Sequence, residues 1–382
     1  MKALKVAVVI GTRPEAVKMV PVVLALKADQ RFTPRLIVTG QHRELLDQVL
    51  DHFQLSPDVD LDVMQPDQSL ADLAVRALSG LDAALAAERP DALLVHGDTS
   101  TTLVGALAAF YRRIPVGHVE AGLRTGDLAN PFPEEANRRL VAQLAQAHFA
   151  PTSQARANLL AEGVAAGRIY VTGNTAIDTL LTLSRRREGA PAKELVLVEC
   201  HRRENFGEPL AAIFGGLAEV LSARPGLRMV ISAHPNPNVQ SALSSAFSGL
   251  AGVEVIEPPS YPEWIDRLVS ATLLVTDSGG AQEEAPALGV PVVLVRRRTE
   301  RPEAVAAGTV WRIDPTLAEV RRTVETLLTD GRRYREMASA INPYGDGAAA
   351  GRVVHGLAHS MGLTKAAPDP YSPLPVGRLP QR

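Results

Sequence analysis

Three carboxylic acids in the first half of the chain, Asp98, Glu120 and Glu134, have the types and spacing for acid–base chemistry. Asp98 and Glu120 follow apolar runs, and Glu134 follows Pro133 at the start of a helix-compatible segment. If the runs are parallel strands, their carboxyl ends meet at one edge of a sheet and bring the acids together. Repulsion would then keep a proton on one of them near neutral pH, which suits a site that needs an acid and a base. Asp98 could instead be only a helix N-cap.

A second stretch, residues 277–303, combines groups that could bind a nucleotide diphosphate. A strand-like apolar run leads into Ser278–Gly280 and then into a helix-compatible segment. Backbone N–H groups at such a turn favour an anion, and glycine lets a phosphate approach closely. Glu283 and Glu284 could accept hydrogen bonds from sugar hydroxyls, and Arg301 adds a cation. The alternative is that the glycines only form a turn and the glutamates only favour the helix start.

Several basic side chains also follow strand-like runs. His201 comes from the second half of the chain, and His234 is a second candidate there, although His-Pro-Asn-Pro also forms an ordinary turn. Arg13 and Lys18 lie about one helical turn apart after the first strand-like run and could both meet phosphate. For Lys18 alone, a solvated helix start is the simpler interpretation. Because Cys200 is the only cysteine, we expect neither a disulfide framework nor a cysteine-rich metal site.

The elements that would position these residues alternate between strand and helix along the chain. Apolar runs at 6–10, 92–95, 195–198 and 272–276 are typical of buried parallel strands, and helix-compatible segments follow them. This alternation predicts an α/β fold of two Rossmann-like, doubly wound parallel-sheet domains that face each other across a cleft. The expected boundaries are 1–183 for the first domain, 184–194 for a polar linker, 195–363 for the second domain and 364–382 for a proline-rich tail.

Length and composition limit the function classes. The chain has 382 residues, of which 46% are hydrophobic, which is ample for packed cores in two domains. A formal net charge of -2 argues against a general nucleic-acid or anionic-membrane binder. No apolar stretch approaches the roughly 20 residues of a membrane helix, and the first apolar run is too short for a signal peptide. We therefore expect a cytoplasmic protein without nucleic-acid or membrane partners.

Taken in order, the short motifs resemble the non-hydrolysing UDP-N-acetylglucosamine 2-epimerases of bacteria. One such segment would be weak support, but the ordered set spans most of residues 1 to 303. The matching segments are G-T-R-P-E-A-V-K-M at Gly11, T-G-Q-H at Thr39, H-G-D-T-S-T-T at His96, H-V-E-A-G-L-R at His118, P-F-P-E-E-A-N-R at Pro131, T-G-N-T at Thr172, H-R-R-E-N-F-G at His201, H-P-N-P-N at His234, D-S-G-G at Asp277 and T-E-R-P-E at Thr299.

The resemblance implies a GT-B-like enzyme that interconverts UDP-GlcNAc and UDP-ManNAc for polysaccharide biosynthesis, as a homodimer, with no cofactor and no metal. It implies anti elimination of UDP to 2-acetamidoglucal, followed by re-addition with the other configuration at C2. Asp98, Glu120 and Glu134 become the acid–base residues, and His201 a catalytic or phosphate-side histidine. The residues implied for substrate binding are Arg13, Lys18, Arg138, Trp264, Ser278, Gly279, Gly280, Glu284 and Arg301.

Some positions match an additional, allosteric UDP-GlcNAc site that bacterial members can carry, and others do not. Gln41, Arg202 and His234 match it, whereas Glu44 and Asp67 stand where glutamine and arginine are expected. We therefore expect weak or altered activation by substrate.

The nucleotide site also departs from the pattern at two positions. Pro259 stands where some members have a glutamine that contacts the nucleotide, and Arg297 stands where aspartate is usual. The departure at Pro259 puts that nucleotide contact in question.

Three other functions remain open on the sequence. A glycosyltransferase of the same fold would need an acceptor and a single carboxylate base rather than three clustered acids. A hydrolysing 2-epimerase would release free ManNAc and UDP. A nucleotide-sugar sensor without catalysis would tolerate loss of Asp98. The sequence also leaves open which carboxylate is the base and which the acid.

Overall fold

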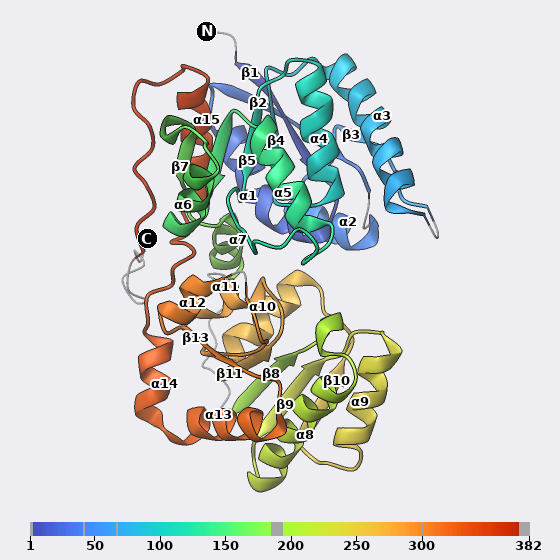
Figure 1. The fold of residues 1–382 in the computed structure, drawn as a ribbon, viewed down its shortest axis with the longest axis vertical. Coiled ribbons are helices and arrows are strands. Elements are labelled where there is room, and N and C mark those ends of the chain that lie inside the picture. The colour runs from blue at the N-terminus through green and yellow to red at the C-terminus, as the bar shows by residue number, and fades with distance from the viewer. Residues whose placement is uncertain (1–2, 41–42, 66–67, 185–193, 300, 374–382) are drawn as a thin grey trace. The chain divides into compact units, whose positions relative to one another are not determined.

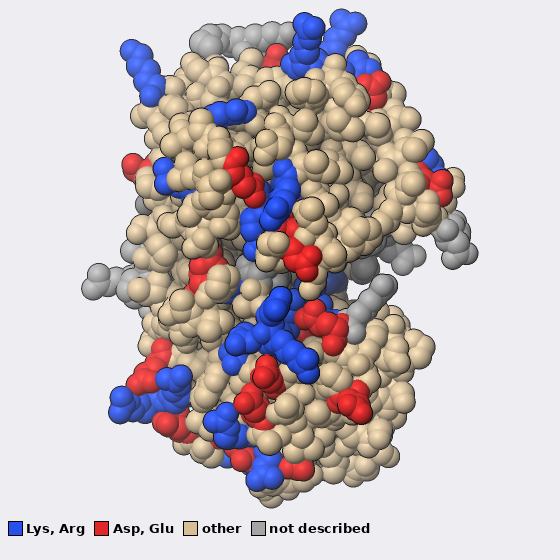
Figure 2. All heavy atoms as spheres, in the orientation of Figure 1, with Lys and Arg blue, Asp and Glu red and all other residues tan. Residues whose placement is uncertain are grey.

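The computed structural model describes residues 3–40, 43–65, 68–184, 194–299 and 301–373 (Figure 1). Within these residues the chain forms two compact units. The first contains the chain up to Thr179 together with Tyr344–Ser372, and the second contains Leu180–Pro343. Both units are α/β, as the alternation of strand and helix predicts, and no described helix has the length and apolar character needed to cross a membrane. On the face shown in Figure 2, acidic and basic side chains are interspersed.

The first unit is built on a parallel sheet with strand order β3-β2-β1-β4-β5-β6-β7. Its strands are β1 (Leu4–Ile10), β2 (Phe32–Val38), β3 (Val59–Asp60), β4 (Ala92–His96), β5 (Val116–Val119), β6 (Ala147–Ala150) and β7 (Ile169–Val171). Its helices are α1 (Arg13–Ala28), α2 (Arg43–His52), α3 (Leu70–Glu88), α4 (Ser100–Tyr111), α5 (Glu134–Leu144), α6 (Ser153–Ala161), the start of α7 (Thr175–Ser184) and α15 (Ala349–Ser360).

The second unit repeats this plan with the parallel order β10-β9-β8-β11-β12-β13. Its strands are β8 (Leu195–Glu199), β9 (Arg228–Ser232), β10 (Val253–Ile256), β11 (Leu273–Thr276), β12 (Val292–Val295) and β13 (Val310–Ile313). Its helices are α8 (Glu208–Ala223), α9 (Pro237–Phe247), α10 (Tyr261–Ser270), α11 (Ala281–Ala287), α12 (Pro302–Ala306), α13 (Leu317–Thr329) and α14 (Gly331–Ala338).

Each sheet has one place where the strand order reverses. In the first unit it lies between β1 and β4, and in the second between β8 and β11. Both faces of such a sheet are covered by helices, so the central strands are apolar throughout, and Val6–Ile10 of β1 is at most 1% exposed. Ligands of doubly wound sheets bind outside the carboxyl ends of the strands at this reversal. The fold therefore points to the loops after β1, β4, β8 and β11.

The carboxyl-terminal boundary of the domains differs from the prediction. Residues 344–372 belong to the first unit, so the second does not extend to residue 363. Helix α15 packs on α1, β6 and β7, and the Asp178 carboxylate accepts hydrogen bonds from the backbone N–H groups of Ala349 and Ala350 at its start. The helical spacing of 349–360 predicts a helix but carries no signal about which sheet that helix covers. Apart from its two end residues, the predicted linker lies outside the described residues.

The start of the predicted tail is also packed rather than loose. Tyr371 is 4% exposed, and its backbone N–H donates to the carbonyl of Val171 at 2.8 Å. The Arg352 guanidinium lies over the Tyr371 ring, 5.6 Å from its centroid. Composition alone predicted a loose tail because proline-rich segments bury little apolar surface. Burial of Tyr371, its backbone hydrogen bond and its contact with Arg352 attach this segment to the first unit.

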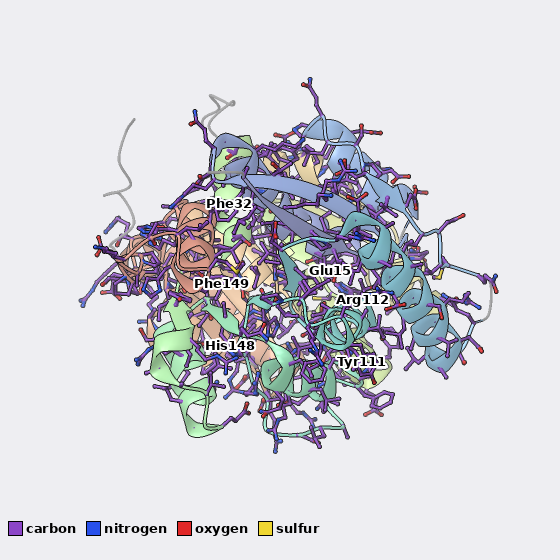
Figure 3. The ribbon with its side chains drawn as sticks, turned by 90° about the horizontal axis from the view of Figure 1, so that it is seen from above. Glu15, Phe32, Tyr111, Arg112, His148 and Phe149 are labelled. Atoms are coloured by element: carbon purple, nitrogen blue, oxygen red, sulfur yellow. The ribbon has the colours of Figure 1, made fainter. Side chains whose placement is uncertain are left out.

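Three buried histidines on adjacent strands, His96 (β4), His118 (β5) and His148 (β6, Figure 3), predict acid sensitivity of the first unit. Desolvation by burial lowers the pKa of His96 to about 4 and the pKa values of His118 and His148 to about 3. The unfolded chain binds these protons near pH 6.5, whereas the native state excludes them. The free energy of unfolding therefore keeps its full value above pH 6.5 and decreases as the pH falls below that value.

His148→Leu should make the free energy of unfolding of the first unit less dependent on pH. Between pH 7 and 5, each such histidine removes about 2 kcal/mol from the free energy of unfolding. Urea denaturation of the first unit at pH 7, 6 and 5 should show a loss smaller by about this amount in the variant than in the wild type. Equal losses in both proteins would contradict a neutral, buried His148.

Candidate functional site

Asp98 follows β4, and its partners come from α5. Arg138 Nη2 bonds to Asp98 Oδ2, and the Asn137 side-chain amide donates to the Asp98 backbone carbonyl at 2.8 Å. Arg138 also lies 3.3 Å from the Glu135 carboxylate, which is fully buried and accepts from the backbone N–H groups of Thr125 and Gly126. With 28% of its side chain exposed, Asp98 remains open to a ligand. Asp98 and Arg138, both predicted as site residues, therefore meet as an ion pair.

Glu120 follows β5, the neighbour of β4, and its backbone has a φ of 62°, the left-handed region that glycine favours. Its carboxylate is enclosed by polar groups. Oε1 accepts from Lys18 Nζ of α1 and from Asn174 Nδ2 at 3.0 Å, and Oε2 lies 3.5 Å from His96 Nε2. Lys18, which the sequence alone assigned to a solvated helix start, is thus a partner of Glu120. Amine and amide donors match the ionised carboxylate, which can only accept.

Glu134 is the first residue of α5 and is half-buried. No residue in the described part of the chain donates a hydrogen bond to its carboxylate, in contrast with Asp98 and Glu120. The three acids therefore have different surroundings. Asp98 pairs with an arginine, Glu120 accepts from a lysine and an amide, and Glu134 accepts from no described residue. Environments that differ in this way are how carboxylates acquire separate roles as acid and base.

Glu15 is a polar centre of the first unit that the sequence reading did not single out (Figure 3). Its side chain is 2% exposed and accepts hydrogen bonds from the backbone N–H groups of Gly11 and Thr12 and from the hydroxyls of Thr12, Thr99 and Thr102. Burial raises the pKa of Glu15, and these donors oppose that shift. The available signal is the capping box Thr12–Glu15 before a helical run. Because Glu15 uses these N–H groups, the turn after β1 does not offer them to a phosphate.

In the second unit, Asp277 organises the loop after β8. It follows β11 and is fully buried, and its carboxylate accepts from the backbone N–H groups of His201 and Arg202 and from Asn205 Nδ2, all between 2.9 and 3.1 Å. His201 Nδ1 is 3.9 Å from Asp277, and the rings of His201 and His234 stack with centroids 5.8 Å apart. Burial, and then the adjacent His201, lower the pKa of His234.

The turn Ser278–Gly280 connects β11 to α11 at the reversal of the second sheet. Ser278 N–H donates to Thr276 Oγ1, whereas no described residue accepts from the N–H groups of Gly279 and Gly280. Arg301, predicted for the nucleotide, donates from Nε to Glu283 at 2.5 Å, and both side chains are buried. Glu283 therefore binds a protein cation, although the sequence placed it against a sugar hydroxyl.

Glu284 accepts from Tyr261 Oη and Trp264 Nε1, each at 3.0 Å. Trp264 is 7% exposed, so the structure shows it orienting a carboxylate rather than presenting an open ring face. A carboxylate has about four acceptor sites, so the indole and phenol bonds alone do not saturate Glu284.

The resemblance implies that Glu284 contacts the nucleotide, so Trp264→Phe should weaken UDP binding about three- to tenfold, because it removes one donor that fixes Glu284. Titration calorimetry with UDP measures the effect. Trp311→Phe, in β13 of the same unit, is the matched control and should leave affinity unchanged. Equal affinities for both variants would contradict the orienting role of Trp264.

Of the residues matched to an allosteric site, Gln41 lies outside the described residues. Arg202 contributes its backbone N–H to Asp277, and His234 is exposed beside His201. These two residues thus adjoin the loop after β8. Among the described residues, no group of three or more His, Cys, Asp or Glu side chains could hold a metal ion.

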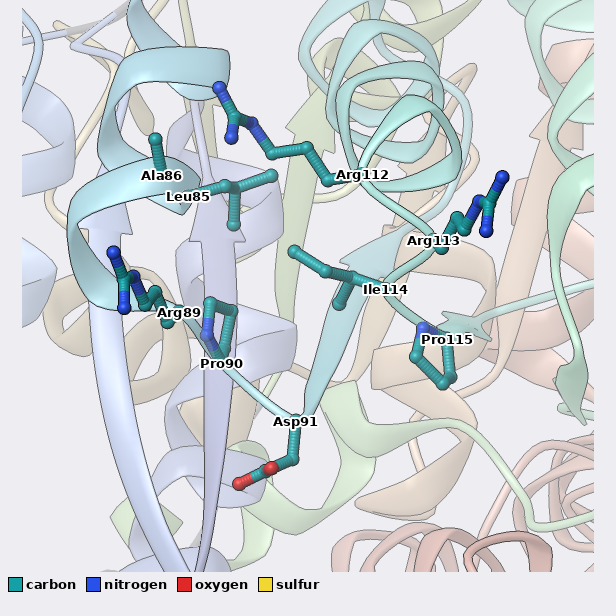
Figure 4. Close-up of a pocket in the computed structure, with 9 residues that line it drawn as sticks. All are labelled: Leu85, Ala86, Arg89, Pro90, Asp91, Arg112, Arg113, Ile114 and Pro115. Carbon is teal, nitrogen blue, oxygen red and sulfur yellow. The ribbon is translucent and has the colours of Figure 1, made fainter.

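A pocket of about 560 Å³ opens elsewhere on the first unit (Figure 4). Its lining includes Asp91 and Pro115, which directly precede β4 and β5, and three arginine side chains border it. It therefore lies at the amino ends of these strands, opposite to the loops that carry Asp98 and Glu120. The pocket is separate from the candidate site.

Comparison with known proteins identifies the family of the chain. The family model described as UDP-N-acetylglucosamine 2-epimerase matches residues 24–358. The UDP-N-acetylglucosamine 2-epimerase of Yersinia pestis is 48% identical over 369 residues, which cover 93% of this chain and 98% of that protein.

Two solved structures extend the likeness to the fold. An epimerase structure from Listeria monocytogenes matches with a TM-score of 0.90 and 41% identity, covering 97% of this chain and all of that one. The UDP-GlcNAc 2-epimerase from Neisseria meningitidis, solved with UDP-GlcNAc bound, matches with a TM-score of 0.87 and 42% identity, covering 93% and 100%. On its sequence and its fold, the chain belongs to the UDP-N-acetylglucosamine 2-epimerase family.

Proposed function

We propose that the protein interconverts UDP-GlcNAc and UDP-ManNAc by elimination and re-addition of UDP. The observation that carries the proposal is the set of three differently surrounded carboxylates, Asp98, Glu120 and Glu134, on the loops beside the reversal of the first sheet. The bound UDP-GlcNAc of the Neisseria relative supports the choice of substrate.

The reaction needs a base on one face of C2 and an acid on the other. In the elimination, the C2–H bond breaks and its electron pair forms the C1=C2 double bond of 2-acetamidoglucal. The C1–O bond breaks at the same time, and its electron pair leaves with UDP. In the return step, a UDP oxygen adds to C1 and C2 takes a proton from the opposite face, which inverts its configuration. Two carboxylates in opposite protonation states can perform both halves.

The surroundings of the carboxylates favour a division of roles. Glu120, which accepts from Lys18 and Asn174 on one oxygen, suits the base. Glu134, to which no described residue donates, is assigned to the opposite face of C2. Asp98, paired with Arg138 and partly exposed, suits a group that orients the sugar.

We assign the nucleotide to the second unit. Loss of UDP requires that the negative charge of the diphosphate be stabilised as it leaves. The N–H groups at Gly279 and Gly280, His201 and the Arg301 region are candidates for this, and Glu284 for a ribose hydroxyl. The turn after β1 is a poor alternative because Glu15 already binds the N–H groups there.

Incubation with UDP-GlcNAc in heavy water tests the function. We expect UDP-ManNAc with deuterium at C2, deuterium in recovered UDP-GlcNAc, and no net release of free sugar. Stoichiometric release of ManNAc and UDP would indicate the hydrolysing reaction instead. Turnover that depends on an added acceptor would indicate a glycosyltransferase, and binding without exchange would indicate a sensor.

The family resemblance supports two further parts of the proposal. We propose that the protein is a homodimer, which light scattering of the eluted protein measures. We also propose that its UDP-ManNAc enters polysaccharide biosynthesis.

A further inference from the structure

We propose that Asn174, between β7 and α7, is a positioning residue that fixes the Glu120 carboxylate for proton transfer. The inference rests on the proposed function and assigns a further residue to it. Asn174 contacts Glu120 rather than the reacting atoms, so its effect would pass through that carboxylate.

The backbone conformation of Glu120 is unfavourable on its own, so contacts with other residues must hold Glu120 in place. A non-glycine residue in the left-handed region costs on the order of 1 kcal/mol or more and persists only where the surroundings impose it. Gly97 passes so close that a Cβ there would lie 3.3 Å from Glu120 Oε2. The carboxylate is therefore set against the loop after β4, with Lys18 and Asn174 holding its other oxygen.

The Asn174 side chain has one orientation. Its Oδ1 accepts from the backbone N–H of Ala176 at 3.0 Å, so its Nδ2 must be the atom that donates to Glu120, also at 3.0 Å. The side chain is 2% exposed and is held from both ends. A rotated amide would place an oxygen against the carboxylate and lose both bonds. This geometry gives Glu120 a fixed neutral donor beside the charged Lys18.

The backbone of Asn174 is held in turn by the carboxyl-terminal segment that returns to the first unit. Asn174 N–H donates to the carbonyl of Tyr344 at 2.6 Å, and Tyr344 is fully buried. The contact is close enough that glycine is needed at Gly345, where a Cβ would lie 2.9 Å from Ile177. Tyr344 is the first residue of the carboxyl-terminal segment that belongs to the first unit, so this segment begins at the residue whose carbonyl holds Asn174.

Two substitutions separate positioning from folding. Asn174→Ser keeps a short oxygen that can accept from Ala176 N–H but cannot reach Glu120. Asn174→Asp keeps the Ala176 bond isosterically and sets a second carboxylate against Glu120, which disfavours its ionised form. We expect kcat for UDP-GlcNAc to fall roughly ten- to hundredfold in both, with KM and UDP affinity near the wild-type values.

The pH profile is the readout that a purely structural role would not change. If Asn174 stabilises the ionised base, the ascending limb of kcat/KM should move to higher pH in Asn174→Ser and further in Asn174→Asp. Thr175→Val, an isosteric change at the next, buried residue, should leave the limb in place. Thermal unfolding of each variant shows whether it is folded.

The outcomes are distinguishable. Folded serine and aspartate variants with an unshifted limb, whether fast or slow, would overturn the positioning role. A wild-type protein that does not exchange deuterium at C2 would instead overturn the proposed function, before any variant is compared.

Discussion

Glu120→Gln is expected to lower turnover of UDP-GlcNAc by roughly 10²- to 10⁴-fold while UDP binds almost normally. The amide has the size of the carboxylate and keeps an oxygen for Lys18 and Asn174, so the surroundings of residue 120 should persist. The glutamine amide cannot accept the weakly acidic proton on C2 of the sugar. The loss should therefore appear in kcat, and deuterium exchange at C2 in heavy water should slow by the same factor.

Asp98→Asn and Glu134→Gln should lower turnover by amounts of the same order, each without loss of the fold. Glu162→Gln is the matched control, because Glu162 is a carboxylate of the first unit that pairs with Arg124 rather than with a predicted site residue. Its variant should turn over at the normal rate. Near-normal rates in all three site variants would reject the assignment of the carboxylates.

Much of the fold follows from the sequence because its central strands are covered by helices on both faces. Runs such as Val6–Ile10 and Leu273–Thr276 are almost fully buried and contain few polar residues, so they are visible without knowledge of their partners. The short edge strand Val59–Asp60 is partly exposed and carries no such signal. The return of α15 to the first unit is decided by contacts with distant residues, and the local pattern does not contain them.

The same division applies to the candidate site. Asp98 and Glu120 could be predicted as neighbours because each follows a strand. The groups that hold them could not, since their partners are remote in sequence: Glu120 bonds to Asn174, 54 residues later, and Glu15 to Thr99, 84 residues later. Glu283 and Arg301, both predicted to contact the ligand, also pair with each other, because burial of one charge requires the other.

Asp277 is the clearest case in the second unit of a residue whose role depends on remote partners. Asp277→Ala should destabilise that unit by about 3–5 kcal/mol, because it leaves the backbone N–H groups of His201 and Arg202 and the Asn205 amide without their buried acceptor. Asp277→Asn can keep Oδ2, which accepts from His201, Arg202 and Asn205, but it replaces Oδ1 with an NH2 group beside the His201 N–H, so its cost should be about 1–2 kcal/mol. Urea denaturation followed through the second unit measures both values.

The two variants should also separate stability from UDP binding. Asp277 sets the direction of the loop that carries His201. UDP affinity should therefore be highest in the wild type, lower in Asp277→Asn and lowest in Asp277→Ala. Asp330→Ala is the matched control: it removes an exposed helix cap of α14 in the same unit, should cost about 1 kcal/mol, and should leave UDP affinity unchanged. If both Asp277 variants bound UDP like the wild type while losing stability, the aspartate would only complete the buried turn, and the diphosphate would not depend on the loop after β8.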